Sequence, residues 1–206
     1  MFQIDSIETP FNSPKVAVQA ITTLGRADAM GLLPRDERME TLDFPTLQIV
    51  VRHIHRAGIG RTIHLGLDDN PADRGAGMEQ ALRNLNAALE ESPSPEFEWT
   101  RMLEILGLDL LAELLGASVS SVRRYSAAAR TTPDEVAGRL HFLSLMIGDL
   151  SGAYNEIGVR QWFHRTRMQL GGRAPSDLLK GRWVPGQEGP SKVRDLARAL
   201  TASPAT

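Results

Sequence analysis

Apolar residues recur at intervals of three and four positions along much of the second half of the chain, which predicts helices there. The longest such run is Val136, Leu140, Leu143, Ile147, Leu150 and Tyr154. Immediately before it, Thr132-Pro133-Asp134-Glu135 combines a capping-box pattern with proline at the first helical position. We therefore expect a helix that begins at this cap, runs to about Ala153 and packs one apolar face against the rest of the protein.

Three shorter helices are expected near the end of the chain, over Val159–Thr166, Pro175–Lys180 and Ser191–Leu200. Gly171-Gly172 and Pro185-Gly186 separate them, because glycine and proline favour turns. The second half of the chain is therefore predicted to be helical.

The N-terminal part has a weaker pattern. Ser13-Pro14 predicts the start of a helix that runs toward Leu24. A second helix is expected from Phe44 to Ala57, with Gly58 at its end. This part is therefore expected to be a small helical or mixed α+β region.

Between the second helix and the middle of the chain, Thr62–Leu67 alternates apolar and polar residues, which indicates a short strand. Asn70-Pro71 is a candidate start for a further helix with apolar residues at Ala81, Leu82, Leu85 and Leu89. The prolines in Glu91–Pro95 break a helix, so this segment is the best candidate for a linker. We accordingly separate residues 1–92 from the rest of the chain, and the resemblance given below divides that rest into 96–155 and 156–206.

The composition is that of an ordinary globular protein, with 206 residues, 42% of them hydrophobic and 23% charged. The sequence has no cysteine, which excludes disulfides and thiolate metal sites. It has neither an apolar run near the roughly 20 residues that a bilayer requires nor a secretory signal at its start. We therefore expect a cytoplasmic protein that is not bound to a membrane.

The net charge of −2 conceals an asymmetry. Residues 1–117 contain 10 Lys and Arg against 18 Asp and Glu, whereas residues 118–206 contain 13 against 7. Eleven of those 13 are arginine, which forms forked contacts with phosphates and guanine edges. A basic half of this kind suits an anionic partner, although a solvated surface explains it equally well.

The segment from Trp99 to Ala129 has the pattern of a helix-turn-helix. Ala112 is small enough for two helices to approach closely, and Gly116 tolerates the positive φ of a tight turn. Val122 then supplies an apolar residue that points back into the crossing. The alternative is a plain helical hairpin inside a core.

The second helix of this motif would expose hydroxyl and basic side chains. Serines at a helix start can meet phosphates or base edges, and arginines can reach guanine or phosphate oxygens. The candidate DNA-binding residues are Ser118, Ser120, Ser121, Arg123, Arg124 and Tyr125. The plain hairpin is the less favoured interpretation because it need not expose such a face.

Flanked by Trp99 and Thr132-Pro133, this segment resembles the Xre-type helix-turn-helix. After it come Gly158–Phe163, Leu170–Leu179 and a closing segment with Val193 and Leu196. Together they resemble the toxin-binding domain of the Xre/MbcA/ParS antitoxins, which has a tryptophan on a short helix, a Leu-x-Gly-x-x-Pro turn, a Leu-Leu pair and a closing helix. The resemblance extends from about Phe97 to Leu200. It implies a mainly α fold, with a helix-turn-helix bundle followed by a small helical C-terminal domain.

The resemblance also implies a function. Members of the family repress their own operon, usually as homodimers on double-stranded operator DNA, and their C-terminal domain blocks a RES-domain toxin that degrades NAD. By position, the residues that would shape or form the toxin-binding surface are Trp162, Leu170, Gly172, Pro175, Leu178, Leu179, Arg194, Arg198 and Leu200. The chain departs from the family in its extra N-terminal region and in a longer Lys180–Pro190 loop that contains Trp183.

Other functions are less well supported by the residues. A free-standing transcription regulator whose N-terminal region dimerises or senses a ligand is the main alternative. His53 and His55 would face different directions on a helix, so they do not predict a metal site, even with His64 nearby. Gly58-Ile59-Gly60-Arg61 lacks the third glycine of a dinucleotide loop, and no catalytic constellation is evident. We therefore expect no cofactor, no metal and no enzymatic activity.

Overall fold

Helices make up most of the computed structural model, which describes residues 4–34, 39–65 and 74–202. Within these ranges the elements are β1 (Ser6–Ile7), α1 (Pro14–Ala29), β2 (Thr41–Leu42), α2 (Phe44–Arg56), α3 (Arg74–Glu90), α4 (Pro95–Leu106), α5 (Leu108–Leu115), α6 (Val119–Ser126), α7 (Asp134–Leu150), α8 (Glu156–His164), the 3₁₀ turn η1 (Met168–Leu170), α9 (Pro175–Leu178) and α10 (Glu188–Ala202). The mainly α fold class predicted from the sequence is confirmed.

The two helices expected early in the chain are confirmed as α1 and α2. Ser13 lies at the N-cap of α1, where Pro14 fits because its fixed φ suits the first turn. The N-cap of α2 is Asp43, whose side chain accepts a hydrogen bond of 2.8 Å from the Thr46 N–H. Gly58 follows α2 with a φ of +92°. Ser13 forms no capping hydrogen bond, so the start of α1 depends on Pro14, whereas that of α2 depends on the Asp43 cap.

The strand expected over Thr62–Leu67 is wrong for its described part, because Thr62–Leu65 is irregular chain. The structure instead has β1 and β2 as a parallel pair, in which Ser6 is opposite Thr41 and Ile7 opposite Leu42. Two residues per strand are too few to produce an alternating pattern. The Asn70-Pro71 helix start lies outside the described residues, but the expected helical residues Leu82, Leu85 and Leu89 are buried on α3.

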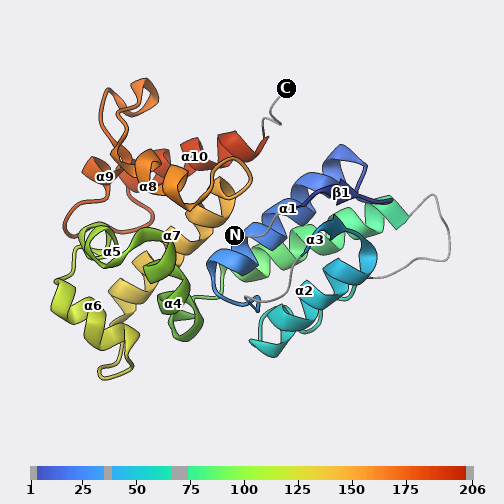
Figure 1. The fold of residues 1–206 in the computed structure, drawn as a ribbon, viewed down its shortest axis with the longest axis horizontal. Coiled ribbons are helices and arrows are strands. Elements are labelled where there is room, and N and C mark those ends of the chain that lie inside the picture. Colours follow the sequence, from blue (N-terminus) through green and yellow to red (C-terminus); the bar gives the residue numbers. More distant parts are fainter. Residues whose placement is uncertain (1–3, 35–38, 66–73, 203–206) are drawn as a thin grey trace.

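The long helix α7 lies between the two halves of the molecule (Figure 1). It contacts α1 on one side and α4, α5 and α10 on the others. Every residue from Arg139 to Leu150 is buried, so the expectation that only one face would be packed is wrong. The core of α4–α10 contains Leu140, and the core of the N-terminal part contains Leu145, so α7 contributes to both.

The start of α7 also differs from the expected capping box. Pro133 occupies the N-cap, and Thr132 lies one position earlier. The Thr132 Oγ1 accepts a hydrogen bond of 3.0 Å from the indole N–H of Trp99 on α4. Glu135 is exposed and pairs with Arg139 at 3.6 Å. The threonine therefore joins α4 to the start of α7 instead of capping the helix.

Helices α1 and α7 cross at a pair of glycines. A Cβ on Gly148 would lie 2.7 Å from the Cα of Arg26, and a Cβ on Gly25 would lie 2.4 Å from the carbonyl oxygen of Gly148. Only glycine permits this backbone approach. Each glycine precedes a buried charged residue, Arg26 on α1 and Asp149 on α7, so the crossing places these two side chains next to each other.

The C-terminal helices lie near their expected positions, as α8, α9 and α10, with ends that differ by a few residues. The start of α8 is set by Asn155, whose side chain accepts from the Gly158 N–H at 2.8 Å. Among the described residues, none of the helices has both the length and the apolar character that crossing a bilayer requires.

Candidate nucleic-acid interface

Helices α5 and α6 form the expected helix-turn-helix around a left-handed glycine. Gly116 ends α5 with φ of 62° and ψ of 33°, a conformation that a Cβ disfavours. The Ala117 N–H then donates to the Ala112 carbonyl at 3.0 Å, which closes the turn. A Cβ on Gly116 would also lie 2.0 Å from the carbonyl oxygen of Gly181, so the position requires glycine for two reasons.

Buried side chains hold α6 against the bundle. Ala112 is 3% exposed and Val122 is fully buried, as the helix-turn-helix pattern predicted. Tyr125 stacks on Trp99 of α4, with ring centroids 6.0 Å apart. One side of α6 is therefore fixed in the core, and the other faces outward.

The outward side begins with three serines. Ser118 is the N-cap of α6, and its Oγ accepts from the Ser121 N–H at 3.1 Å. Its hydroxyl also lies 3.0 Å from the Ser120 hydroxyl and 2.9 Å from that of Ser121. Hydroxyl groups thus gather at the positive end of the helix dipole, where a phosphate is favoured.

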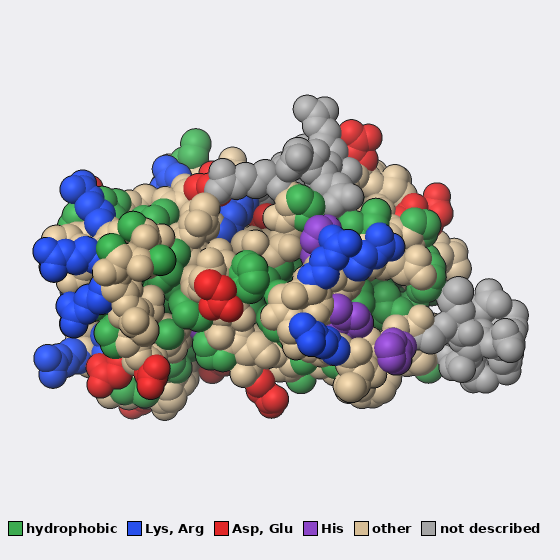
Figure 2. Space-filling view, turned by 90° about the horizontal axis from the view of Figure 1, so that it is seen from below, with side chains coloured by type: hydrophobic (Ala, Val, Ile, Leu, Met, Phe, Trp, Pro, Cys, Tyr) green, Lys and Arg blue, Asp and Glu red, His purple; other side chains and the backbone are tan. Residues whose placement is uncertain are grey.

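Arg123 and Arg124 are exposed near the other end of α6. Within the described ranges, neither side chain forms an ion pair or a hydrogen bond. Figure 2 shows Lys and Arg side chains gathered at the end of the molecule that carries α6. We use "the α6 surface" for the set Ser118, Ser120, Ser121, Arg123 and Arg124.

Tyr125 differs from the other candidate DNA-binding residues. It is 8% exposed, because its ring lies between Trp99 and the guanidinium carbon of Arg130, which is 5.8 Å from the ring centroid. Its position on the helix, three residues after Val122, turns it back toward the core. We correct its role from a DNA contact to an anchor of α6.

Most of the candidate partner-binding residues in the C-terminal part are core residues. Trp162 is 1% exposed and Leu179 is fully buried, while Pro175 is buried at the start of α9. Leu178 is half-buried against the same core. The Trp162 ring meets Phe163 edge to face at 5.3 Å. These residues shape the small domain, and little of their surface is available to a partner.

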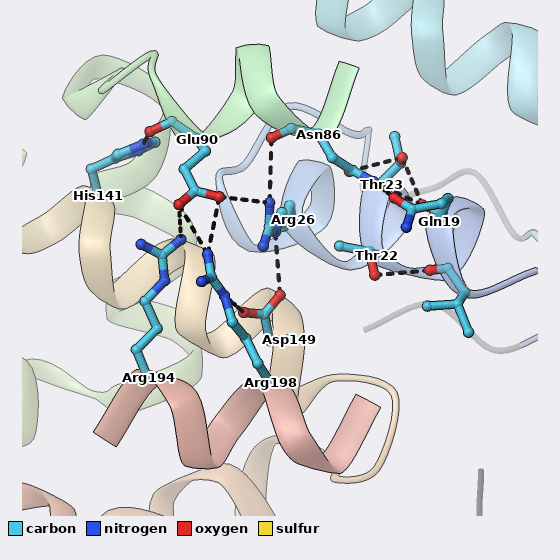
Figure 3. Close-up of polar contacts among 11 residues, drawn as sticks. Gln19, Thr22, Thr23, Arg26, Asn86, Glu90, His141, Asp149, Arg194 and Arg198 are labelled. Atoms are coloured by element: carbon cyan, nitrogen blue, oxygen red, sulfur yellow. Dashed lines mark hydrogen bonds and ion pairs between the residues drawn. The ribbon is translucent and has the colours of Figure 1, made fainter. Parts of the chain in front are cut away.

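The two arginines expected to face a toxin are bound within the chain. Arg194 and Arg198 lie on α10 and reach Glu90, the last residue of α3, at 3.0 and 2.9 Å (Figure 3). A carboxylate from the N-terminal part therefore occupies them. No pattern near these arginines indicates Glu90, which is about a hundred residues away in the sequence.

Glu90 belongs to a larger, partly buried cluster that the sequence pattern did not predict. Arg26 contacts Glu90 at 3.4 Å and Asp149 at 3.2 Å, and Arg198 lies 3.7 Å from Asp149. We call these five residues, Arg26, Glu90, Asp149, Arg194 and Arg198, the Glu90 cluster. Arg26 and Asp149 interrupt the apolar pattern of two helices, which is a sequence signal that could have indicated them.

The charges of the cluster control its carboxyl groups. Burial alone would raise the pKa of Glu90, but the nearby Arg194, Arg198 and Arg26 outweigh it and hold that pKa below its ordinary value. For Asp149 burial is the stronger influence, so its pKa is raised although Arg26 partly opposes the shift. Glu90 is therefore the carboxylate that the three arginines stabilise.

A second buried carboxyl lies nearby. The Glu98 Oε1 is 2.6 Å from His141 Nδ1, and His141 Nε2 is 3.0 Å from the Glu90 carbonyl. Burial raises the pKa of Glu98, although the hydrogen bond with His141 opposes the shift. Together with the Glu90 cluster, this pair ties α3, α4, α7 and α10 together.

The histidines near α2 do not form a metal site with other donors. Among the described residues, no group of three or more His, Asp or Glu side chains has an arrangement suited to a metal ion. His55 and His64 instead line one shallow groove together with arginines.

Comparisons with protein-family models, with curated proteins and with solved structures find no match to this chain. Function is therefore inferred from the residues and their geometry.

Proposed function

We propose that this protein is a DNA-binding transcription regulator that inserts α6 into the major groove of an operator, in the manner of helix-turn-helix proteins and as a homodimer. The α6 surface is the observation that carries this proposal. It combines two exposed arginines, unpaired within the part of the chain that the structure describes, with hydroxyl groups at the start of a helix that Val122 and Tyr125 hold outward.

The chemistry of the α6 surface fits DNA better than it fits a solvated face. Arginine contacts guanine or phosphate in a forked geometry, and serine hydroxyls hydrogen-bond phosphate oxygens. Because surface charges usually gain only slightly from pairing, the lack of a carboxylate partner within the described ranges costs the fold little and leaves both guanidinium groups available to an anionic ligand. The turn at Gly116 and the close approach of Gly181 keep this helix in one orientation.

The test is operator binding by Arg123→Gln together with Arg124→Gln. Fluorescence anisotropy with a labelled duplex from upstream of the gene would give the Kd. We expect the Kd to rise at least about tenfold, since each good contact to a base contributes about 1–3 kcal/mol. The slope of log K against log salt should also become shallower, by about 0.9 for each phosphate that the variant no longer neutralises.

A matched control removes the same charge elsewhere. Arg83→Gln with Lys192→Gln changes two exposed cations on α3 and α10. This variant should retain the wild-type affinity within about twofold, because its positions are far from α6 in the fold. Equal loss of binding in the two double variants, or no loss in either, would contradict α6 as the reading helix.

We also propose, as a second function, that the C-terminal part binds a RES-domain toxin as an antitoxin does. The order of elements supports it: Trp162 on short α8, a turn at Gly171, Pro175 at the start of α9, then the closing helix α10. The binding of Arg194 and Arg198 to Glu90 shifts the expected contact away from these arginines. Co-expression with the product of a neighbouring toxin gene should yield a stable complex on size-exclusion chromatography, and failure to co-purify would leave only the regulator.

A further inference from the structure

A groove in the N-terminal part is lined by an unusual set of side chains. Its cavity volume is about 640 Å³, and it lies between one face of α2 and the chain that returns after Gly60. The lining residues are Gln48, Val51, Arg52, His55, Arg56, Arg61, Ile63, His64 and Leu65. We call this the α2 groove. Its volume falls within the range of about 300–1,000 Å³ that small-molecule sites occupy.

The polar lining of the α2 groove is cationic. Three arginines and two histidines line it, and none of the described lining residues is an Asp or Glu. Within the described ranges, Arg52, Arg56 and Arg61 have no carboxylate partner. Arg61 is held in place because its Nε donates to the His55 carbonyl at 3.2 Å. Guanidinium groups placed together, without a carboxylate partner in the described part of the chain, create a positive potential that attracts an anionic ligand.

Helix geometry explains only part of this arrangement. Arg52, His55 and Arg56 share one face of α2 near its C-terminal end, where the helix dipole favours cations. The dipole does not account for Arg61 and His64, which come from the segment after Gly60 and also line the groove. Two chain segments therefore converge with the same charge. In addition, the Nε2 of His55 is buried and has no hydrogen-bond partner among the described residues.

The groove has an apolar component as well. Val51, Ile63 and Leu65 contribute aliphatic side chains, and Gln48 adds an amide that can donate and accept hydrogen bonds. Such a combination fits a ligand with a planar or apolar portion next to its negative charge. Arginine can stack on a planar ring as well as pair with phosphate.

A small molecule fits the groove better than continued contact with DNA does. Figure 2 shows Arg and His side chains gathered over the part of the surface that carries α2, and acidic side chains between them and the basic end with α6. Carboxylates between two cationic areas repel a polyanion that would lie across both. The groove therefore forms a separate site.

We propose that the α2 groove binds a nucleoside phosphate, with the phosphate at Arg52, Arg56 and Arg61 and the base against Val51, Ile63 and Leu65. This site does not depend on the proposed function of α6. It gives the N-terminal part, for which the sequence pattern indicated no role, a ligand of defined chemistry.

Isothermal titration calorimetry of the full chain tests the proposal, with AMP, ADP, GDP, ATP, adenosine and inorganic phosphate as probes. We expect at least one of the nucleotides to bind with a Kd below about 1 mM, and both adenosine and inorganic phosphate to bind at least about tenfold more weakly. Arg52→Gln with Arg56→Gln should raise the Kd of the best nucleotide at least about tenfold, because the variant cannot form the charge-assisted hydrogen bonds to phosphate. Arg83→Gln, which removes an exposed cation from α3 in the same half of the molecule, should leave this Kd unchanged.

Several outcomes would overturn the proposal. Absence of nucleotide binding by the wild type, or equal binding by the wild type and the Arg52/Arg56 variant, would do so directly. Binding of inorganic phosphate as tight as that of every nucleotide would reduce the site to a simple anion site. If only non-specific DNA affinity fell in the variant, the groove would belong to a nucleic-acid surface instead. Circular dichroism and Tm of each variant separate loss of binding from loss of fold, and the conservative Arg52→Lys with Arg56→Lys variant should restore part of the affinity.

Discussion

Two pairs of arginines in this protein have opposite environments. Arg123 and Arg124 on α6 are exposed and unpaired within the described chain, whereas Arg194 and Arg198 on α10 share the carboxylate of Glu90. Both pairs lie in the basic half of the sequence. The difference teaches that a basic segment does not by itself provide a surface for an anionic partner, because a distant carboxylate can neutralise it within the fold.

Other arginines in the same half are also used internally. The Nε of Arg139 donates to the Trp183 carbonyl at 2.7 Å, and its Nη1 donates to the Leu115 carbonyl at 3.0 Å. Arg160 donates to the Ile105 carbonyl at 2.5 Å. The charge surplus after residue 117 therefore overstates the charge available to DNA, and Arg123 and Arg124 are among the exposed arginines that have no internal partner within the described chain.

The environment of Arg194 and Arg198 depends on the crossing of α1 and α7. This crossing brings Arg26 against Asp149, beside the Glu90 carboxylate that the two arginines share. Gly148→Ala tests this dependence and has the largest expected effect on stability. The new Cβ would meet the Arg26 backbone at 2.7 Å, and overpacking of this kind costs about 1–3 kcal/mol. We expect the free energy of unfolding, from urea titration followed by circular dichroism, to fall by about 2 kcal/mol.

Gly138→Ala is the matched control, because it lies on the same helix with no atom within 4 Å of its Cβ position. Both variants gain the helix propensity of alanine, about 1 kcal/mol, so their difference isolates the crossing. We expect the control to be slightly more stable than the wild type. Equal stability of the two variants would mean that α1 and α7 separate at little cost and that the Glu90 cluster does not depend on their approach.

Glu90→Gln removes the carboxylate that distinguishes the two arginine pairs. Loss of a charge that neutralises three arginines destabilises the fold, but Glu90 is 35% exposed, so we expect about 1–2 kcal/mol and not the larger cost of a fully buried pair. Glu91→Gln, an exposed neighbour, should change the stability by less than about 0.5 kcal/mol. If Glu90→Gln and Glu91→Gln lowered the free energy of unfolding by similar amounts, the pairing of Arg194 and Arg198 with Glu90 would contribute no stability. The distinction between paired and free arginines would then be lost.

The pH dependence of this effect follows from the lowered pKa of Glu90. A carboxyl group with a folded-state pKa below its ordinary value of 4.5 contributes stability that is fully present above that value and lost as the pH falls through the folded-state pKa. The stability difference between wild type and Glu90→Gln should therefore be constant near neutral pH and shrink below pH 4.5. A difference that grew in acid would contradict the direction of the shift. Comparison with the variant cancels the opposite contribution of Glu98, which lies outside the Glu90 cluster.

The sequence predicted well those features that short segments determine. Gly116 between Ala112 and Val122 specified the helix-turn-helix, because turn conformation and helix crossing depend on residues a few positions apart. Proline and cap residues likewise predicted the starts of α1 and α9. The exposed members of the α6 surface were found for the same reason, since the period of a helix assigns each residue a side.

Features that join distant segments were not predicted. Tyr125 was assigned to the DNA-binding face together with its neighbours, although its spacing of three residues from Val122 turns it toward the core, where it stacks on Trp99. Arg194 and Arg198 were assigned to a partner because Glu90 is remote in the sequence. Thr132 fits the capping-box pattern, but its hydroxyl oxygen accepts a hydrogen bond from the Trp99 indole N–H instead. In each case a tertiary contact replaced the role that local pattern favoured.

The smallest expected effect concerns the serines that accompany the free arginine pair. Ser118 caps α6 by accepting from the Ser121 N–H, whereas the Ser120 hydroxyl contacts only the Ser118 hydroxyl within the described chain. Ser118→Ala should therefore lower the free energy of unfolding by about 1 kcal/mol, the usual cost of losing a cap, and Ser120→Ala by less than about 0.5 kcal/mol. In anisotropy titrations with operator DNA, Ser120→Ala should weaken binding more than this small stability change explains. If Ser120→Ala left operator affinity unchanged, recognition at the α6 surface would be confined to Arg123 and Arg124, and the serines would serve only to start the helix.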